Sequence, residues 1–372
     1  MLAARSVSTR RELDEWIALT DRLYSGVPQF VPPVRQRLRA LPARKDPVLR
    51  HGEIELLSVV RDGVVVARAT AHTNAKLDAK LGARQLLFGF TEFDDDDEVF
   101  AALADALTER ARRIGAARLF GPVSLLPNQS GGVVTSGYEE RGFVDSPWNP
   151  PYYPALYERH GFVREFEGET FVIPLEQLVA PPDELIPFDE ERIAREELVV
   201  RRANPRRMKR ELAIIRQLLN ASFAQLGYYT EIDEDELAYQ VAGLGYLLDS
   251  RIALYLLKAG EPVAFILCIP DISTFLQKVG GDLSAPNLLR LLLTRKRYRS
   301  EAICVIQGTL PAEQGHGYIR LLTRELLRNL RGAGYRTLRG TFIEHENTGS
   351  SAYADRLGRP AHGVTLYSRP VE

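Results

Sequence analysis

The sequence predicts a mixed α/β fold in which one structural unit occurs twice along the chain. Strand-like apolar segments alternate with segments of helical periodicity, as expected of a sheet covered by helices. The order of these segments in residues 1–178 returns in residues 198–372. Residues 179–197 carry Pro181-Pro182 and many charges, which is typical of a linker. A chain of 372 residues is also long enough for two domains of ordinary size.

The first half begins with a helical pattern and continues with a hairpin, whose turn is the Arg61-Asp62-Gly63 segment. Gly115 then marks the end of a second helix. The expected helices are residues 12–24, 99–114 and 153–160, and the expected strands are residues 54–60, 64–71, 85–93, 117–123 and 164–174.

The second half repeats this order, with a hairpin about Ala259-Gly260-Glu261 and one insertion, a basic amphipathic helix over residues 288–299. The other expected helices are residues 208–225, 318–330 and a short one near Ala352. The expected strands are residues 198–202, 252–258, 262–269, 302–306, 335–343 and a last strand ending at Tyr367.

A glycine-containing loop, residues 311–317 (Pro-Ala-Glu-Gln-Gly-His-Gly), connects a predicted strand to a predicted helix. Glycines let backbone N–H groups point into such a loop, and the helix N-terminus adds partial positive charge. The loop matches neither the dinucleotide-binding pattern nor the P-loop pattern. An ordinary strand-to-helix turn is the simpler alternative.

The loop resembles the pyrophosphate loop of the GNAT acyltransferase superfamily, Gln/Arg-x-x-Gly-x-Gly/Ala, at Gln314 and Gly317, and departs from it at Ile319. Residues 156–162 are similar to the GNAT motif Leu-Tyr-x-x-x-Gly-Phe. The segment Asn-Pro-Pro-Tyr-Tyr at residues 149–153 resembles a group of bacterial tandem-GNAT proteins. The resemblance implies two tandem GNAT-like domains, residues 1–178 and 198–372.

The corresponding loop of the first half is acidic, with four aspartates at Asp94–Asp97. Carboxylates there would repel a pyrophosphate, and they would also cap the helix that follows. We therefore expect the first domain to be a degenerate copy on the acceptor side. Superfamily enzymes often carry, at the position of Tyr157, the acid that protonates the departing thiolate. Because we expect no donor in the first domain, we expect Tyr157 to be structural.

In the second half, Ala354 replaces that tyrosine, so proton transfer must fall to other groups. A carboxylate with a raised pKa, or a histidine, could take the proton from an amine. The candidate catalytic residues are Glu344, His345 and Glu346. The candidate donor-binding residues are Gln314, Gly315, His316, Gly317, Tyr318 and Asn347. The candidate acceptor-binding residues are Asn128, Tyr152 and Tyr153. A solvated charged loop is the alternative interpretation of the catalytic group.

The resemblance implies an acyltransferase that moves an acyl group from acyl-CoA, such as acetyl-CoA, to an amine-type nitrogen of a small molecule. No metal is expected. One alternative is an aminoacyl-tRNA-dependent transferase, with tRNA contacted by two arginine-rich segments, residues 201–210 and 290–299. Solvated helix faces explain most of these arginines as well. The other alternative is a catalytically inactive ligand-binding or interaction protein.

Overall charge gives no reason to expect DNA or a membrane as a partner, because 48 basic and 49 acidic residues leave a formal net charge of −1. Any polyanion site must therefore be local. Cys268 and Cys304 lie in apolar segments and are expected to be buried thiols. We find no signal-peptide pattern and no apolar segment of membrane-spanning length, and expect a cytoplasmic protein.

Overall fold

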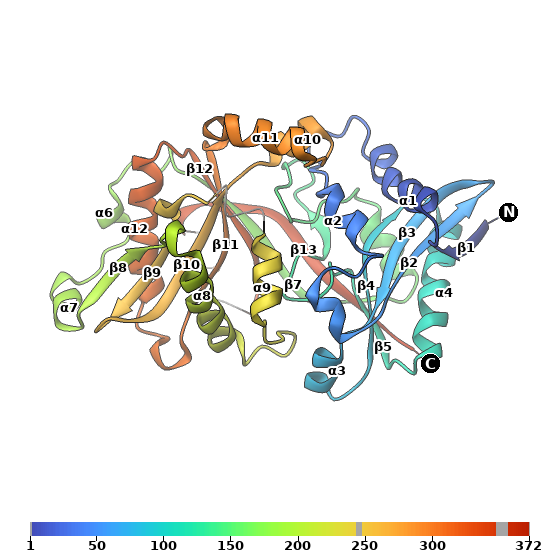
Figure 1. The fold of residues 1–372 in the computed structure, drawn as a ribbon, viewed down its shortest axis with the longest axis horizontal. Coiled ribbons are helices and arrows are strands. Elements are labelled where there is room, and N and C mark those ends of the chain that lie inside the picture. Colours follow the sequence, from blue (N-terminus) through green and yellow to red (C-terminus); the bar gives the residue numbers. More distant parts are fainter. Residues whose placement is uncertain (1, 243–247, 347–355, 372) are drawn as a thin grey trace.

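The computed structural model describes residues 2–242, 248–346 and 356–371 and contains one mixed sheet that runs through both halves of the molecule (Figure 1). The strand order is β1-β2-β3-β4-β5-β13-β7-β12-β11-β10-β9-β8, with β6 paired to β13. Most neighbours are antiparallel, but β4–β5 and β11–β12 are parallel pairs. The mixed α/β fold predicted from the sequence is confirmed.

The first half supplies seven strands and its own set of helices. The strands are β1 (Leu2–Ser6), β2 (Ile54–Arg61), β3 (Val64–His72), β4 (Gln85–Phe93), β5 (Arg118–Gly121), β6 (Val133–Ser136) and β7 (Val163–Pro174). The helices are α1 (Arg10–Leu23), α2 (Arg35–Ala40), the 3-10 helix η1 (Pro47–His51), α3 (Ala75–Leu81), α4 (Asp97–Arg113) and α5 (Tyr153–Arg159).

The segment between the halves forms two short helices, α6 (Pro182–Leu185) and α7 (Glu190–Arg195). The second half has the strands β8 (Leu198–Arg202), β9 (Ala253–Lys258), β10 (Glu261–Pro270), β11 (Glu301–Thr309), β12 (Thr337–Glu344) and β13 (Arg359–Pro370). Its helices are α8 (Met208–Phe223), α9 (Glu234–Val241), α10 (Ser273–Val279), α11 (Ala285–Thr294) and α12 (Tyr318–Gly332), with 3-10 helices at η2 (Pro205–Arg207), η3 (Ser250–Ile252), η4 (Arg295–Tyr298) and η5 (Pro311–Glu313).

The last strand of each half lies beside the other half's parallel pair. Strand β7 pairs antiparallel with β12, and β13 pairs antiparallel with β5. The two exchanged strands also pair with each other at the centre of the sheet. Each half therefore obtains one strand of its sheet from the other half.

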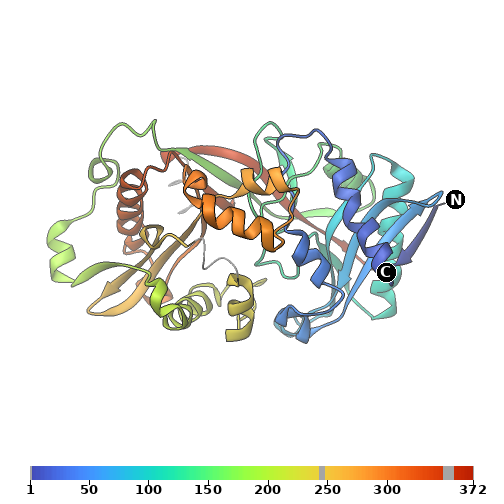
Figure 2. The same cartoon turned by 45° about the horizontal axis from the view of Figure 1, so that its top comes forward.

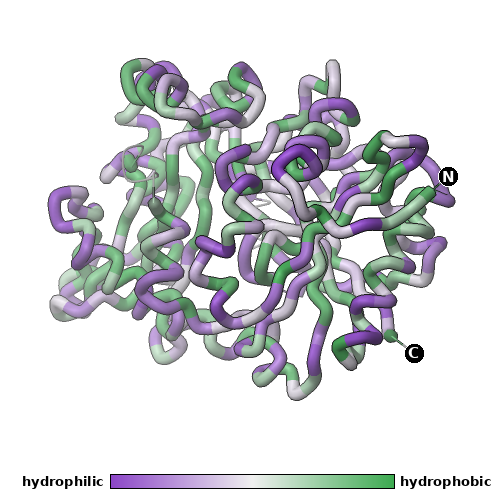
Figure 3. Tube along the Cα trace, turned by 45° about the vertical axis from the view of Figure 1, so that its right-hand side comes forward, coloured by the Kyte–Doolittle hydropathy of each residue, from purple (hydrophilic) through white to green (hydrophobic). Residues whose placement is uncertain are grey.

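Helices cover both faces of the sheet in each half. In β2, Leu57 packs in the core under α4, whereas its neighbour Leu56 packs in the core under α1, because alternate strand residues face opposite sides. In β9, Leu254 packs under α12 and Tyr255 packs under α8 in the same way. In Figure 3, hydrophobic colour follows many of the strands, while hydrophilic colour is common in outer loops.

The elements expected within the described residues are present, most of them with shifted ends. Strand β4 has the predicted bounds, and β11 continues to Thr309, beyond the expected end at residue 306. The helix expected over residues 288–299 begins earlier, at Ala285, and changes to a 3-10 helix at Arg295. The helix expected near Ala352 lies outside the described residues. No helix in the described ranges combines the length and the apolar character needed to cross a membrane.

Candidate functional site

The glycine loop, residues 311–317, lies between the carboxyl end of β11 and the first turn of α12. Gly315 and Gly317 have φ values of 78° and 74°, in the left-handed region that favours glycine. Gly317 is the N-cap of α12 and provides no side-chain cap. The first N–H groups of α12 are therefore not satisfied by a capping side chain, which leaves this helix end suited to an anion.

Arg192 of α7 and Glu196, the C-cap residue of this helix, hold the glycine loop in place. The Arg192 guanidinium donates a hydrogen bond to the His316 carbonyl oxygen at 2.9 Å and lies over the Tyr318 ring. The Tyr318 side chain is buried, and its hydroxyl donates to Glu196 at 2.6 Å. Hydrogen bonds from Arg192 and Tyr318 lower the pKa of Glu196 to about 2. Only the backbone of Tyr318 is thus available to a ligand at the loop.

Two other predicted donor-binding residues are exposed at this loop. The Gln314 side chain donates a hydrogen bond to the Thr309 carbonyl oxygen at 3.3 Å. The exposed His316 ring stacks on Tyr318, with 5.6 Å between ring centroids. Asn347, the remaining candidate of this group, lies outside the described residues. These assignments stay predictions.

The parallel pairing of β11 and β12 ends beside this loop. Its last paired residues are Cys304 and Gly340, and β11 carries an irregularity at Val305, where the register with β10 shifts. The Thr341 hydroxyl donates to the carbonyl oxygens of Cys304 and Val305, at 3.2 and 3.0 Å. Beyond this point β11 continues to Thr309 without further ladder pairs to β12 among the described residues.

Glu344 ends β12, at the same edge of the sheet as the glycine loop, because β11 and β12 are parallel. It is half-buried, and the Tyr228 hydroxyl donates to its Oε2 at 3.3 Å. Burial and the nearby Glu346 raise the pKa of Glu344, which makes its carboxylate a better proton acceptor. Burial and the Glu344 charge raise the pKa of Tyr228 to about 12, so this phenol remains a hydrogen-bond donor.

The other two catalytic candidates are exposed in the turn after β12. The His345 N–H donates to the Glu167 carbonyl oxygen at 3.0 Å, which ties the turn to β7. Strand alternation does not extend to His345 and Glu346, because β12 ends at Glu344. Ala354, which stands where the superfamily has its tyrosine, lies outside the described residues.

Carboxylates of the acidic loop in the first half already have partners within the protein. Asp96 is the N-cap of α4 and accepts hydrogen bonds from the N–H groups of Glu98 and Val99. Its other oxygen binds Arg61 at 2.7 Å. Asp94 pairs with Arg22, and Asp97 with Arg159. The expected capping role of this acidic loop is confirmed.

The tyrosines of the Asn-Pro-Pro-Tyr-Tyr segment pack against β4. The buried Tyr153 hydroxyl donates to Glu92 at 2.9 Å and accepts the Phe93 N–H, while the Tyr152 hydroxyl donates to the Phe93 carbonyl oxygen at 2.5 Å. Tyr157 is also buried and donates to Thr91 at 3.0 Å. These contacts give the three rings a packing role in the first half.

Asn128 differs from the two tyrosines. Its Oδ1 atom is buried and has no hydrogen-bond partner among the described residues. It therefore keeps an acceptor atom unused by the protein. Acceptor binding by Asn128, Tyr152 and Tyr153 stays a prediction.

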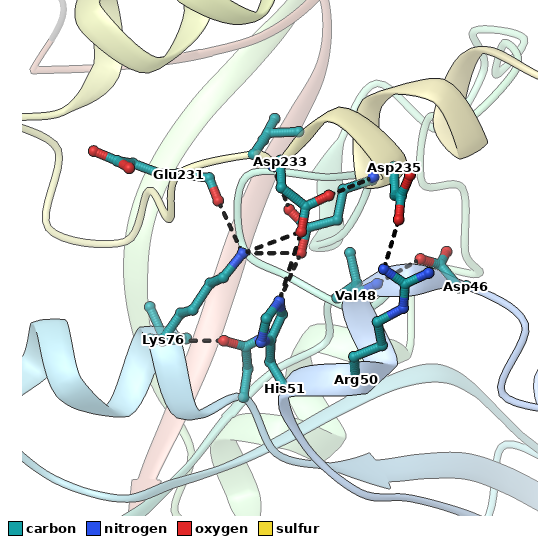
Figure 4. Close-up of polar contacts among 12 residues, drawn as sticks. Asp46, Val48, Arg50, His51, Lys76, Glu231, Asp233 and Asp235 are labelled. Atoms are coloured by element: carbon teal, nitrogen blue, oxygen red, sulfur yellow. Dashed lines mark hydrogen bonds and ion pairs between the residues drawn. The ribbon is translucent and has the colours of Figure 1, made fainter.

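Contacts between the halves fix the segment that carries Tyr228. Lys80 donates to the carbonyl oxygens of Ala224 and Tyr229, at 2.9 and 2.7 Å, on either side of Tyr228. Lys76 reaches Glu236 at 3.1 Å, and Arg50 reaches Asp235 at 2.8 Å. In Figure 4, Lys76, His51 and Arg50 from the first half point toward the acidic residues of α9 and the turn before it.

One group of potential metal ligands occurs among the described residues, formed by His51, Asp233 and Glu236. The Lys76 ammonium already lies 3.1 Å from Glu236 and 3.8 Å from Asp233. Both carboxylates also form the capping box of α9. A lysine therefore supplies the positive charge at this position, and the donor set is a poor fit to a metal ion.

Sequence reasoning missed Tyr228 and the lysines that fix its segment. Tyr228 follows Gly227 in a stretch that matches none of the motifs considered, and its contact with Glu344 joins distant parts of the chain. Lys76 and Lys80 are likewise ordinary surface residues in sequence terms. No local signal could have identified these residues.

No protein-family model matches the chain. Among curated proteins it is similar to protein YghO of Escherichia coli K12, with 24% identity over 373 residues, covering 99% of this chain and 95% of the relative. It is also similar to the bacterial ceramide synthase of Caulobacter vibrioides, with 24% identity over 294 residues, covering 76% of this chain and 73% of the relative.

Solved structures show the same fold. A tandem GNAT protein from the clavulanic acid biosynthesis pathway aligns with a TM-score of 0.61 at 13% identity, covering 100% of this chain and 99% of that one. A GCN5-related N-acetyltransferase from Sphaerobacter thermophilus aligns with a TM-score of 0.53 at 13% identity, covering 100% and 96%. The chain is thus a tandem GNAT-fold protein, as its motifs predicted.

Proposed function

We propose that the protein is an N-acyltransferase that moves an acyl group from acyl-CoA to the amine nitrogen of a small molecule. The observation that carries the proposal is the second half's combination of an uncapped helix N-terminus and a carboxylate with a raised pKa at one edge of the sheet. The tandem GNAT fold supports it, because this is a fold of acyltransferases.

The donor would bind with its pyrophosphate at the glycine loop. Backbone N–H groups at Gly315, Gly317 and the first turn of α12 would donate to the phosphate oxygens. The thioester would then lie along β11 where its pairing with β12 has ended. Backbone groups of this unpaired stretch would orient the thioester carbonyl.

Glu344 would act as the general base. The amine nitrogen attacks the thioester carbonyl carbon, Glu344 takes the proton that the nitrogen loses, and the carbon–sulfur bond breaks. The coenzyme A thiolate takes up a proton and leaves as the thiol. Tyr228 would position Glu344 through the hydrogen bond that it donates to the carboxylate.

A relative named bacterial ceramide synthase narrows the proposed substrates. A ceramide is the fatty acyl amide of a long-chain amino alcohol, so its formation is an N-acyl transfer to an amine. We extend this class to the present chain: a fatty acyl-CoA donor and an amine acceptor with a hydrocarbon chain.

Donor binding tests the proposal directly. Replacement of both Gly315 and Gly317 by valine should weaken acyl-CoA binding at least tenfold by calorimetry, because β-branched residues are strained at these φ values and the loop would lose its shape. Gly63→Val is the control, since Gly63 also has a positive φ, of 85°, and open space where a Cβ would stand, but lies in the β2–β3 turn. Thermal unfolding checks that each variant folds.

A series of donors tests the substrate class. Acetyl-CoA, longer acyl-CoAs and charged tRNA would each be added to the wild-type protein during thermal unfolding. A ligand at 100 times its dissociation constant adds about 2.7 kcal/mol of apparent stability. We expect the largest shift with long-chain acyl-CoA. Stabilisation by charged tRNA alone would assign the donor to the tRNA class, and no shift with any donor would indicate an inactive protein.

A further inference from the structure

Helix α11 is apolar on two opposite sides, although only one side packs on the protein. Leu291 is fully buried with Phe275 and Leu276 of α10 and with Val31 and Val34 of the first half. Leu289 and Leu293 are one helical turn apart and lie on the other side, where 58% and 78% of their surfaces are exposed. The second side of α11 has no protein partner among the described residues.

Positive charge surrounds this exposed side. Arg290 lies in α11 between the two exposed leucines, and Lys296 and Arg297 follow in η4; all three are exposed. Exposed leucines next to lysine and arginine are the pattern of a helix that lies in the interface of a membrane. Figure 2 shows α11 in orange on the outside of the molecule, across the front of the sheet.

Hydrogen bonds hold the segment that leads into α11 against the first half. Arg35 donates to the Gly280 carbonyl oxygen, Gln36 bonds to Asp282, and Gln277 donates to the carbonyl oxygens of Pro28 and Phe30. These contacts fasten the turn before α11, and helix α10, to the first half. Binding through α11 would therefore require little ordering of the chain, which favours affinity.

We propose that α11 and η4 dock the protein on an anionic lipid bilayer, with Leu289 and Leu293 inserted among the acyl chains and Arg290, Lys296 and Arg297 against the headgroup phosphates. Overall charge gave no reason to expect a membrane, but these charges are local. A second copy of the chain is a poorer occupant, because a two-fold contact through this side would place the same cations against each other.

The docking surface is distinct from the acyl-transfer site. Helix α11 and η4 precede the first residue of β11, whereas the glycine loop follows the last residue of this strand. The inference therefore does not depend on the proposed reaction. Loss of lipid binding should leave turnover of a short-chain, water-soluble acceptor unchanged.

Vesicle flotation tests the proposal with the full chain. We expect binding to vesicles of phosphatidylcholine with phosphatidylglycerol to be at least tenfold stronger than binding to phosphatidylcholine alone, and to weaken as salt rises. The Leu289→Glu, Leu293→Glu double variant should lose binding at least tenfold. Its control is Val64→Glu, Val179→Glu, which adds the same charge at two exposed valines elsewhere.

A second pair of variants tests the charges. Lys296→Glu, Arg297→Glu should weaken binding to the anionic vesicles at least tenfold, while Arg11→Glu, Arg336→Glu, also exposed, should change it less than threefold. Equal effects of both pairs, or equal binding to neutral vesicles, would overturn the proposal. Self-association in sedimentation that the leucine variant abolishes would assign the surface to a second copy instead.

Discussion

The first turns of α4 and α12 occupy corresponding places in the two halves, but their N–H groups have different partners. In α4, the Asp96 carboxylate accepts two of these N–H groups and pairs with Arg61. In α12, Gly317 stands at the cap position and offers no side chain to the N–H groups. One side chain thus decides whether a helix end is filled by the protein or remains suited to a ligand.

The parallel strand pairs beside these helices also differ between the halves, in how far their two strands stay together. In the first half, the Val123 N–H donates to the Phe88 carbonyl oxygen at 2.8 Å, and the backbone at Gly89 and Val123 is too close to admit a Cβ. In the second half, only the Thr341 hydroxyl bonds to β11 beyond Gly340 among the described residues. The strands β4 and β5 thus stay in contact beyond their parallel pairing, whereas β11 and β12 separate.

The largest effect is expected at Glu344, the general base of the reaction proposed for the second half. Glu344→Gln should lower kcat by about 100-fold or more, because general base catalysis contributes at least this much. Acyl-CoA affinity should stay within threefold of wild type. Steady-state kinetics measures kcat, and calorimetry measures the affinity for acyl-CoA. A variant with unchanged kcat would show that another group accepts the proton.

Transplanting acidic charge into the second loop should reproduce the first half's exclusion of the donor. Gln314→Asp with His316→Asp should weaken acyl-CoA binding about 30-fold, because each of the two carboxylates repels the pyrophosphate by about 1 kcal/mol across water. Gln314→Asn with His316→Asn is the uncharged control. Calorimetry at low and high salt measures the difference, which should shrink as salt rises. Equal affinities of both variants would place the pyrophosphate elsewhere.

Removing the cap of α4 should destabilise the first half without opening a donor site. Asp96→Ala should lower the free energy of unfolding by about 1 kcal/mol, whereas Asp96→Asn should keep part of the capping. Turnover should be unchanged in both, as it should when all four aspartates of residues 94–97 are replaced by asparagine. Lost turnover in a folded variant would give the aspartates a catalytic role.

The Asp96 cap should also make stability depend on pH. The hydrogen bond from Arg61 lowers the pKa of Asp96. A depressed pKa gives stability above the unfolded pKa of about 4 that is lost as pH falls through the folded value. The unfolding temperature of the wild type should therefore fall more steeply below about pH 4 than that of Asp96→Asn.

The smallest effect concerns the pH dependence of catalysis. Burial and, to a smaller extent, the Glu346 charge raise the pKa of Glu344, and the base must be ionised to act. Turnover should fall as the medium becomes more acidic than this raised pKa. Glu346→Gln should lower the pKa of Glu344 and move the acid limb of the kcat profile to lower pH. If the acid limb moves to higher pH or does not move, the limb reports the titration of a group other than Glu344.

The sequence predicted what depends on local patterns. An apolar run located β4, the Arg61-Asp62-Gly63 turn located the first hairpin, and the acidic run predicted that a carboxylate caps α4. The glycine loop was found because left-handed glycines leave a sequence signal. It could not predict the hydrogen bond between Tyr228 and Glu344, because that contact depends on how distant segments fold together.

The same limit applies to the segment between the halves. Its prolines and charges predicted a linker, but Arg324 and Arg328 of α12 pair with Glu190 and Asp183 and hold α6 and α7 in place. The sequence also could not predict which side of α11 packs on the protein. Periodicity indicated a basic amphipathic helix there, but only the packing of Leu291 shows which side faces outward.

The exchange of β7 and β13 has a consequence for how the chain matures on the ribosome. The sheet of the first half reaches β5 early in synthesis, but the strand that covers the open side of β5 is β13, which is made only after β8 to β12 of the second half. An unpaired strand edge invites association with other chains. The nascent first half must therefore wait with β5 unprotected until β13 has left the ribosome, and the emergence of β13 rather than of the first half should set the moment at which the first half becomes resistant to proteases.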